Sequence, residues 1–167
     1  TAAVVPKIPT VVVNKTYIGT DPSDTYYIAK YDGSEVRVPK APQIYSPDGP
    51  VTIFFKDGKM TGYYTIVYYI DGRSTSFDKN FMLYLSSTCG NNESIKRNII
   101  EKIVETSWQN YATNISAASV KKNGYNCFTG SSGDSNTAFE HLTSDLWQFG
   151  IGIKSISFVG SPTITMQ

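Results

Sequence analysis

The sequence predicts an α+β fold in which a mostly antiparallel sheet carries two packed helices. A long run from Met60 to Ile70 is typical of a central β-strand, because β-branched and aromatic residues fill both of its faces. Apolar residues recur at steps of three and four from Glu93 to about Ala112, which indicates an amphipathic helix. A second helical pattern follows and leads directly into the aliphatic run 151–159, which is typical of a closing strand.

The central strand has two well-filled faces. One face contains Thr61, Tyr63, Thr65, Val67 and Tyr69, and the other contains Tyr64, Ile66, Tyr68 and Ile70. Such a strand is expected in the middle of a sheet, with packing on both faces or with one face kept as an aromatic surface for a partner. The upstream run 51–55 is its predicted hairpin partner, because the intervening Asp57-Gly58 dipeptide favours the positive φ of a tight reversal.

The amino-terminal part predicts further short strands. Residues 1–9 are expected to be an extended lead-in, and Thr10–Val13 a first strand. Residues 25–31 and 35–38 flank Asp32-Gly33 and predict a hairpin. A proline-punctuated connection follows, with the short segment 43–45 inside it.

The second helix is expected to begin at the capping residue Asn136 and to end at Gly150, a typical left-handed closing residue. The preceding segment 121–136 is rich in Gly, Ser and Asn and predicts a flexible surface insert. In the last strand, Ile151 and Ile153 are out of phase with Ile156 and Phe158. A bulge or a change of face is therefore expected near Lys154. The predicted organisation is a single domain over 10–160 and a tail over 161–167.

Composition argues against several classes of partner. The 167 residues have a net charge of +1 and a pI near 7.6, so no strong field favours nucleic acid. A groove that stacks nucleic-acid bases needs basic residues beside its aromatic rings. The tyrosine-rich strand has no Lys or Arg between Lys59 and Arg73. Core packing explains its tyrosines better. The alternative is an oligomer or partner surface, for which the candidates are Tyr63, Tyr64, Tyr68, Tyr69, Trp108 and Trp147.

Few residues in the sequence could serve in catalysis or metal binding. Cys89 and Cys127, with a single histidine in the chain, make no metal framework, and they are either bridged or free. His141 and Asp145 are one helical turn apart and could belong to a Ser-His-Asp arrangement. No Gly-x-Ser-x-Gly turn supplies a nucleophile, however, and an ordinary surface pair is the better interpretation. No catalytic residue, cofactor or metal is predicted. No apolar run of about twenty residues indicates a membrane span.

Three segments, taken in order, resemble the SPFH or band 7 domain of stomatins, prohibitins and flotillins. Residues 55–70 are similar to its Lys-Asp-Gly turn and long strand, and residues 95–111 are placed like its following helix. Residues 142–158 are similar to its closing helix and strand, with Ile153, Ile156 and Phe158 at the aliphatic positions. The resemblance covers roughly residues 10–165.

The resemblance implies a non-enzymatic scaffold that forms homo-oligomers and organises membrane or client proteins. Membrane attachment would come from segments outside this chain, on a side of the membrane that the sequence does not indicate. The alternative function is a secreted or surface-assembled structural subunit, such as a pilin-like or virion component, with a Cys89–Cys127 disulfide. An unrecognised hydrolase is the third hypothesis.

Overall fold

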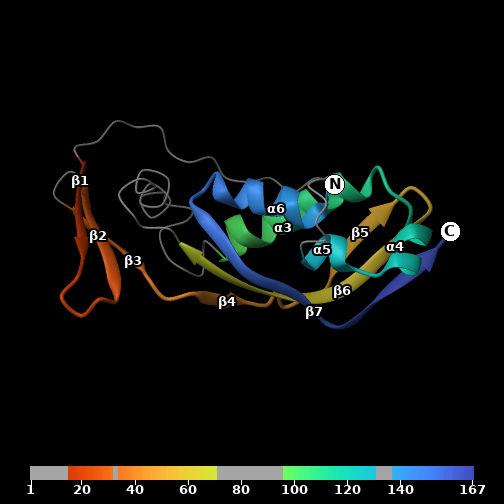
Figure 1. The fold of residues 1–167 in the computed structure, drawn as a ribbon, viewed down its shortest axis with the longest axis horizontal. Coiled ribbons are helices and arrows are strands. Elements are labelled where there is room, and N and C mark those ends of the chain that lie inside the picture. The colour runs from red at the N-terminus through yellow and green to blue at the C-terminus, as the bar shows by residue number, and fades with distance from the viewer. Residues whose placement is uncertain (1–14, 32–33, 71–95, 131–136) are drawn as a thin grey trace.

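The computed structural model describes residues 15–31, 34–70, 96–130 and 137–167, and it confirms the predicted α+β class (Figure 1). The antiparallel strands form two separate sheets, and helices cover one side of the larger sheet. The predicted lead-in and the predicted strand Thr10–Val13 lie outside the described residues.

The larger sheet is organised around β6 (Gly58–Ile70), the strand predicted to be central. Strand β7 (Ile151–Met166) pairs antiparallel with the full length of β6. Along the opposite edge of β6, β5 (Val51–Phe55) pairs with its first part and β4 (Gln43–Tyr45) with its last part. The predicted β5–β6 hairpin is therefore confirmed, and part of the proline-rich connection forms an additional strand.

The smaller sheet has the order β1–β2–β3 and lies at one end of the molecule (Figure 1). It contains β1 (Lys15–Thr20), β2 (Tyr26–Tyr31) and β3 (Ser34–Pro39), all antiparallel. The predicted hairpin around Asp32-Gly33 is confirmed by the pairing of β2 with β3.

Helix α3 (Glu101–Ala112) follows a π-helical segment, η1 (Lys96–Ile100), so the predicted helix is confirmed over its described part. Helix α6 (Ala138–Trp147) packs beside α3 on the same side of the sheet (Figure 1). The side chain of Thr137, rather than the predicted Asn136, caps α6 by accepting a hydrogen bond from the Glu140 N–H at 3.2 Å.

The prediction of a flexible surface insert over 121–136 was wrong for its described part. Helix α4 (Ala117–Asn123) extends into it, and α5 (Asn126–Thr129) lies within it. Phe128 of α5 is fully buried in the core. Glycine and asparagine made the composition of this segment resemble a loop, but one buried aromatic ring is enough to fix a single turn of helix against the sheet.

Strand β7 shows the predicted bulge and extends further than predicted. Its register with β6 shifts by one residue at Lys154, so Ile151, Ile153, Ile156 and Phe158 all face the helices. The predicted tail 161–167 is wrong, because β7 continues to Met166 and pairs with the first residues of β6. Gly160 and Pro162 are residues that commonly interrupt a strand. A second irregularity in the pairing occurs there, where Gly160 has a φ of +73°, and β7 resumes its pairing with β6 beyond it.

The β5–β6 turn depends on Gly58 for space rather than for a positive φ. A Cβ atom on Gly58 would lie 2.4 Å from the Thr165 carbonyl oxygen of β7 and 3.2 Å from the Ala117 Cβ of α4. Positive φ was the expected reason for this glycine, but its φ is not positive. The missing side chain instead allows three elements to meet at one point.

We expect Gly58→Ala to lower the free energy of unfolding by about 1–3 kcal/mol, since β7 or α4 must shift to admit the methyl group. Gly49→Ala is the matched control, because a Cβ at that exposed position has no neighbour within 4 Å. Urea denaturation of both variants measures the difference, and equal stability would contradict the steric explanation.

Asp57 connects the same turn to the start of α4. Its carboxylate accepts a hydrogen bond from the Ala117 N–H at 2.6 Å and a longer one from the Ala118 N–H. These backbone donors, that of Ala117 above all, lower the pKa of Asp57 from its usual value near 3.8. The carboxylate thus supplements Ser116, whose Oγ accepts from the Ser119 N–H, in satisfying the free amides of the helix start.

A lowered carboxyl pKa stabilises the folded state above the unfolded-state pKa, and this contribution disappears as pH falls through the folded-state pKa. Stability should therefore fall on acidification below about pH 4, and Asp57→Asn should make that loss smaller. Asp48→Asn, at an exposed position, serves as the control. Urea midpoints measured at neutral pH and at about pH 3 test this, and an unchanged pH dependence in Asp57→Asn would contradict it.

Candidate functional site

The most conspicuous surface of the described residues is the side of the larger sheet that faces away from the helices. Alternation along β6 places Tyr63, Val67 and Tyr69 on this side, while Tyr64 and Tyr68 point into the core. The neighbouring strands add further apolar side chains to the same side. We call the set Ile44, Phe54, Tyr63, Val67, Tyr69 and Val159 the open face.

The large apolar side chains of the open face are exposed to solvent to an unusual extent. Ile44 is 64% exposed, Phe54 57%, Val159 60% and Tyr63 50%. The strand register places Ile44 opposite Val67 and Val159 opposite Tyr63, so the exposed groups form cross-strand pairs. Paired, exposed apolar groups on adjacent strands are typical of a contact surface rather than of isolated surface residues.

Tyr69 is held in a fixed position on this face. A Cβ atom on Gly152 of β7 would collide with the Tyr69 ring at 2.1 Å, so the ring lies directly over that glycine. The glycine leaves room for the aromatic ring, and the ring covers the backbone that the glycine exposes. This is a physical role that the sequence did not reveal for either residue.

The structure divides the six aromatic residues that were candidates for a partner surface. Tyr63 and Tyr69 belong to the open face, and Trp147 is partly exposed on α6. Tyr64, Tyr68 and Trp108 are at most 3% exposed, so a surface role for them is wrong. Pattern alone could not separate neighbouring tyrosines, because which face is buried depends on where the helices pack. The exposed Ile44, Phe54 and Val159 were missed, although Phe54 is out of phase with the three buried residues of its strand.

Gln109 of α3 covers the outer edge of β5. Its Nε2 donates to the Phe54 carbonyl oxygen at 2.8 Å, and its Oε1 accepts from the Phe54 N–H at 2.9 Å. One amide side chain thereby satisfies both backbone groups that a neighbouring strand would otherwise bind. Sequence reasoning missed this residue, because nothing local connects positions 55 residues apart.

The weak catalytic hypotheses receive no geometric support. Asp145 accepts a hydrogen bond from the buried Ser107 hydroxyl at 2.5 Å, which joins α6 to α3. A nucleophilic serine would instead donate to the histidine, and His141 is exposed with its ring 6.3 Å from that of Tyr111. Ser107 and Asp145 therefore form a helix–helix contact.

Cys127, the cysteine within the described residues, gives no evidence of a reactive site. Cys127 is half-buried in α5 and forms no disulfide within the described part of the chain. Burial raises the pKa of its thiol, which disfavours the nucleophilic thiolate. Cys89 lies outside the described residues, so the Cys89–Cys127 bridge stays a prediction.

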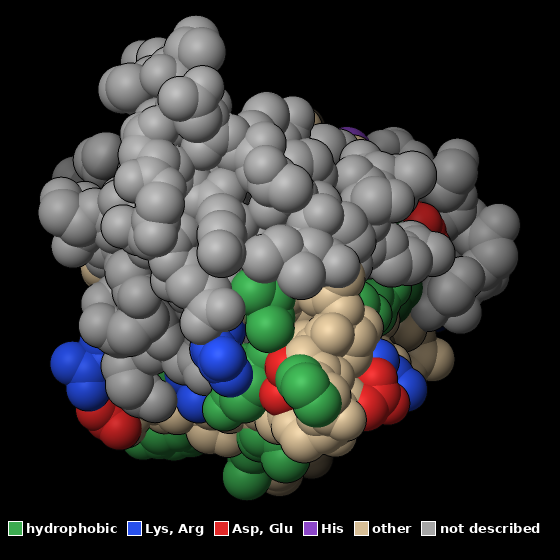
Figure 2. All heavy atoms as spheres, turned by 90° about the vertical axis from the view of Figure 1, so that its left-hand side faces the viewer, with side chains coloured by type: hydrophobic (Ala, Val, Ile, Leu, Met, Phe, Trp, Pro, Cys, Tyr) green, Lys and Arg blue, Asp and Glu red, His purple; other side chains and the backbone are tan. Residues whose placement is uncertain are grey.

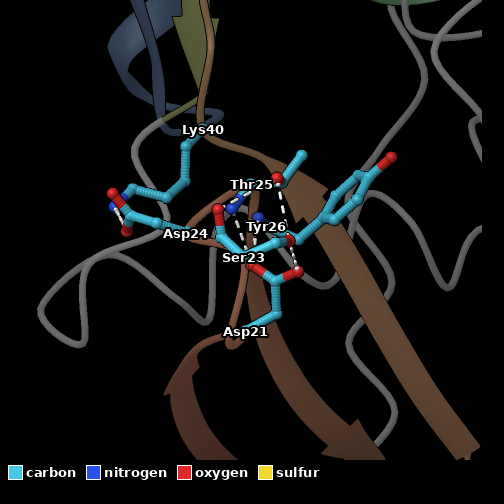
Figure 3. Close-up of polar contacts among 6 residues, drawn as sticks. All are labelled: Asp21, Ser23, Asp24, Thr25, Tyr26 and Lys40. Atoms are coloured by element: carbon cyan, nitrogen blue, oxygen red, sulfur yellow. Dashed lines mark hydrogen bonds and ion pairs between the residues drawn. The ribbon is translucent and has the colours of Figure 1, made fainter.

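The β1–β2 turn contains a cluster of polar contacts among neighbouring residues (Figure 3). The Asp21 carboxylate accepts from the Thr25 N–H at 2.7 Å, the Tyr26 N–H at 2.9 Å and the Ser23 hydroxyl at 2.6 Å. The Ser23 hydrogen bond is the largest cause of a lowered Asp21 pKa. Asp24, with a positive φ of 59°, forms an ion pair with Lys40 at the start of the chain leaving the small sheet. Because the Asp21 oxygens accept hydrogen bonds from the protein itself, the cluster acts as a structural turn.

The described residues contain neither a cluster of metal-ligating side chains nor a membrane-spanning helix. No group of three or more His, Cys, Asp or Glu side chains there is arranged to hold a metal ion. No helix in the described ranges has the length and hydrophobicity needed to cross a bilayer. The end view in Figure 2 shows basic and acidic side chains scattered among hydrophobic ones on its described surface, rather than gathered by sign.

Comparison with known proteins adds no family assignment: no protein-family model and no curated protein sequence matches this chain. The resemblance to SPFH or band 7 domains therefore rests on the order of three sequence segments and stays a prediction.

We expect Gln109→Ala to expose the Phe54 backbone to water and to lower the free energy of unfolding by about 1 kcal/mol. Hydrogen exchange of the Phe54 amide should become faster, because its acceptor is lost. Gln148→Ala, at an exposed position near the end of α6, is the control. Unchanged exchange at Phe54 would show that Gln109 does not protect this edge.

Proposed function

We propose that this chain is a non-catalytic scaffold domain that associates with further copies of itself through the open face. The observation that supports this proposal is the exposure of four large apolar side chains, Ile44, Phe54, Tyr63 and Val159, on one side of a sheet. Apolar groups left in water on a continuous face favour association with a second apolar face.

A second copy fits this surface better than a charged partner does. Threonine and serine occupy most of the remaining outward positions, including Thr61, Thr65, Ser155 and Ser157. Among the paired outward positions of the four strands of the larger sheet, Lys59 alone is charged, and the exposed Lys154 at the bulge adds a second lysine. A nearly neutral face can meet its own copy with little repulsion, and two sheets can pack face to face through interdigitating side chains.

The resemblance to SPFH or band 7 domains gives this proposal a more specific form, in which the copies assemble on a membrane and organise client proteins. The alternative form is a secreted or surface-assembled structural subunit. Both forms require self-association, so one experiment tests what they share. The full gene sequence would separate them, by a membrane anchor and coiled coil in the first case or a cleaved leader in the second.

Sedimentation velocity over a range of protein concentrations should show reversible self-association. The double variant Ile44→Lys, Val159→Lys should weaken it by about a hundredfold, since burial of each side chain contributes about 1.5 kcal/mol. The double variant Ser119→Lys, Ser144→Lys adds the same charge at exposed helix positions and should associate like the wild type. A monomer at every concentration, or equal weakening in the control, would contradict the proposal.

A further inference from the structure

A cavity of about 530 Å³ lies between α3 and the outer edge of β5, and Phe54 of the open face is one of the residues that line it. Residues of the β4–β5 connection, including Pro47 and Pro50, form part of its wall. Tyr64 of β6 and several residues of α3 complete the lining. The volume is within the range of sites that bind small molecules or single side chains.

The polar groups that line this cavity include several oxygen acceptors. Glu101 and Glu105 are one turn apart on α3, so their carboxylates are on the same side of the helix and both line the cavity. Tyr64 and Thr106 also line it, and the hydroxyl group of each is buried without a hydrogen-bond partner in the described residues. Tyr64 is only 3% exposed, so its hydroxyl has been removed from water without compensation.

Acidic side chains act on Tyr64 and on the neighbouring Tyr45, while the Arg97 guanidinium opposes them at Tyr45. Burial raises the pKa of Tyr64, and the nearby carboxylates of Glu101 and Glu105 raise it further. Burial also raises the pKa of Tyr45 to about 12, with further contributions from the charge of Glu101 and from a hydrogen bond between the Tyr45 and Glu101 side chains. Both tyrosines are therefore neutral at physiological pH, and Glu101 and Glu105 are the acidic residues of the lining.

We propose that this cavity binds an organic ammonium group. An ammonium group has three N–H donors and one positive charge, so it can donate to Glu101, Glu105 and the Tyr64 hydroxyl together. A site for a multivalent metal ion is less well matched, because no group of three or more ligating side chains is found among the described residues. The ammonium group can come from a free amine or from a lysine side chain of a partner. This proposal does not rest on self-association.

The structure supplies a reporter for the experiment. The Trp108 ring contacts that of Tyr64, with 5.4 Å between ring centroids. Since the chain has two tryptophans, Trp147→Phe leaves Trp108 as the single source of tryptophan fluorescence. In this background, titration with pentylamine should give a saturable change in fluorescence, and neutral 1-pentanol should give none. The capped amino acid Nα-acetyl-lysine N-methylamide tests the second source: tighter binding than pentylamine favours a partner's lysine, and weaker binding favours a free amine.

Variants test whether the named residues hold the amine. Glu101→Gln and Glu105→Gln should each weaken pentylamine binding about tenfold, and Tyr64→Phe should weaken it severalfold while keeping the aromatic ring in the core. Glu140→Gln on α6 is the matched control and should bind like the background protein. An equal response to pentylamine and 1-pentanol, no saturable response, tighter saturation by calcium chloride, or unchanged binding in Glu101→Gln and Glu105→Gln would each overturn the proposal.

Discussion

The packing of Trp108 is the interaction on which the rest of the structure depends. Its fully buried ring contacts Tyr64 of β6, Phe128 of α5 and Phe158 of β7, each with 5.4 Å between ring centroids. A helix, a short helical turn and the two longest strands are therefore fixed relative to one another through one side chain. Edge-to-face and tilted contacts of this kind add to the apolar area that is removed from water. Loss of this ring would remove an aromatic packing contact from β6, α5 and β7 at once.

The position of Trp108 also decides which residues of the sheet are available for function. Once α3 covers one side of β6, alternation along the strand places Tyr64 and Tyr68 inside, and Tyr63 and Tyr69 remain outside. The bulge at Lys154 extends this division to β7, because without the extra residue either Ile151 and Ile153 or Ile156 and Phe158 would face solvent. Helix packing and one inserted residue thus produce a buried face and an open face from strands that are apolar on both sides.

Local patterns were sufficient to predict the features that depend on neighbouring residues. The alternation of β6, the spacing of apolar residues in α3 and the phase change at Lys154 are all visible within about twenty residues. Features set by distant partners were not predictable. The final segment of β7 resembles a tail because Gly160 and Pro162 interrupt it, and only its pairing with β6 reveals a strand. The covering of β5 by Gln109 and the cavity beside α3 likewise need tertiary proximity that no local pattern contains.

Two tyrosine hydroxyl groups, those of Tyr125 and Tyr64, differ in whether the protein supplies a hydrogen-bond partner for them. Tyr125 is partly buried, and its hydroxyl donates to the Pro162 carbonyl oxygen at 3.2 Å, so burial of that group is compensated. The Tyr64 hydroxyl has no such partner among the described residues, and phenylalanine would fill the same core space without an uncompensated oxygen. A tyrosine at this position therefore costs stability unless something else contacts its oxygen. Because Tyr64 lines a cavity together with Glu101 and Glu105, a bound donor is the compensation that fits the remaining geometry.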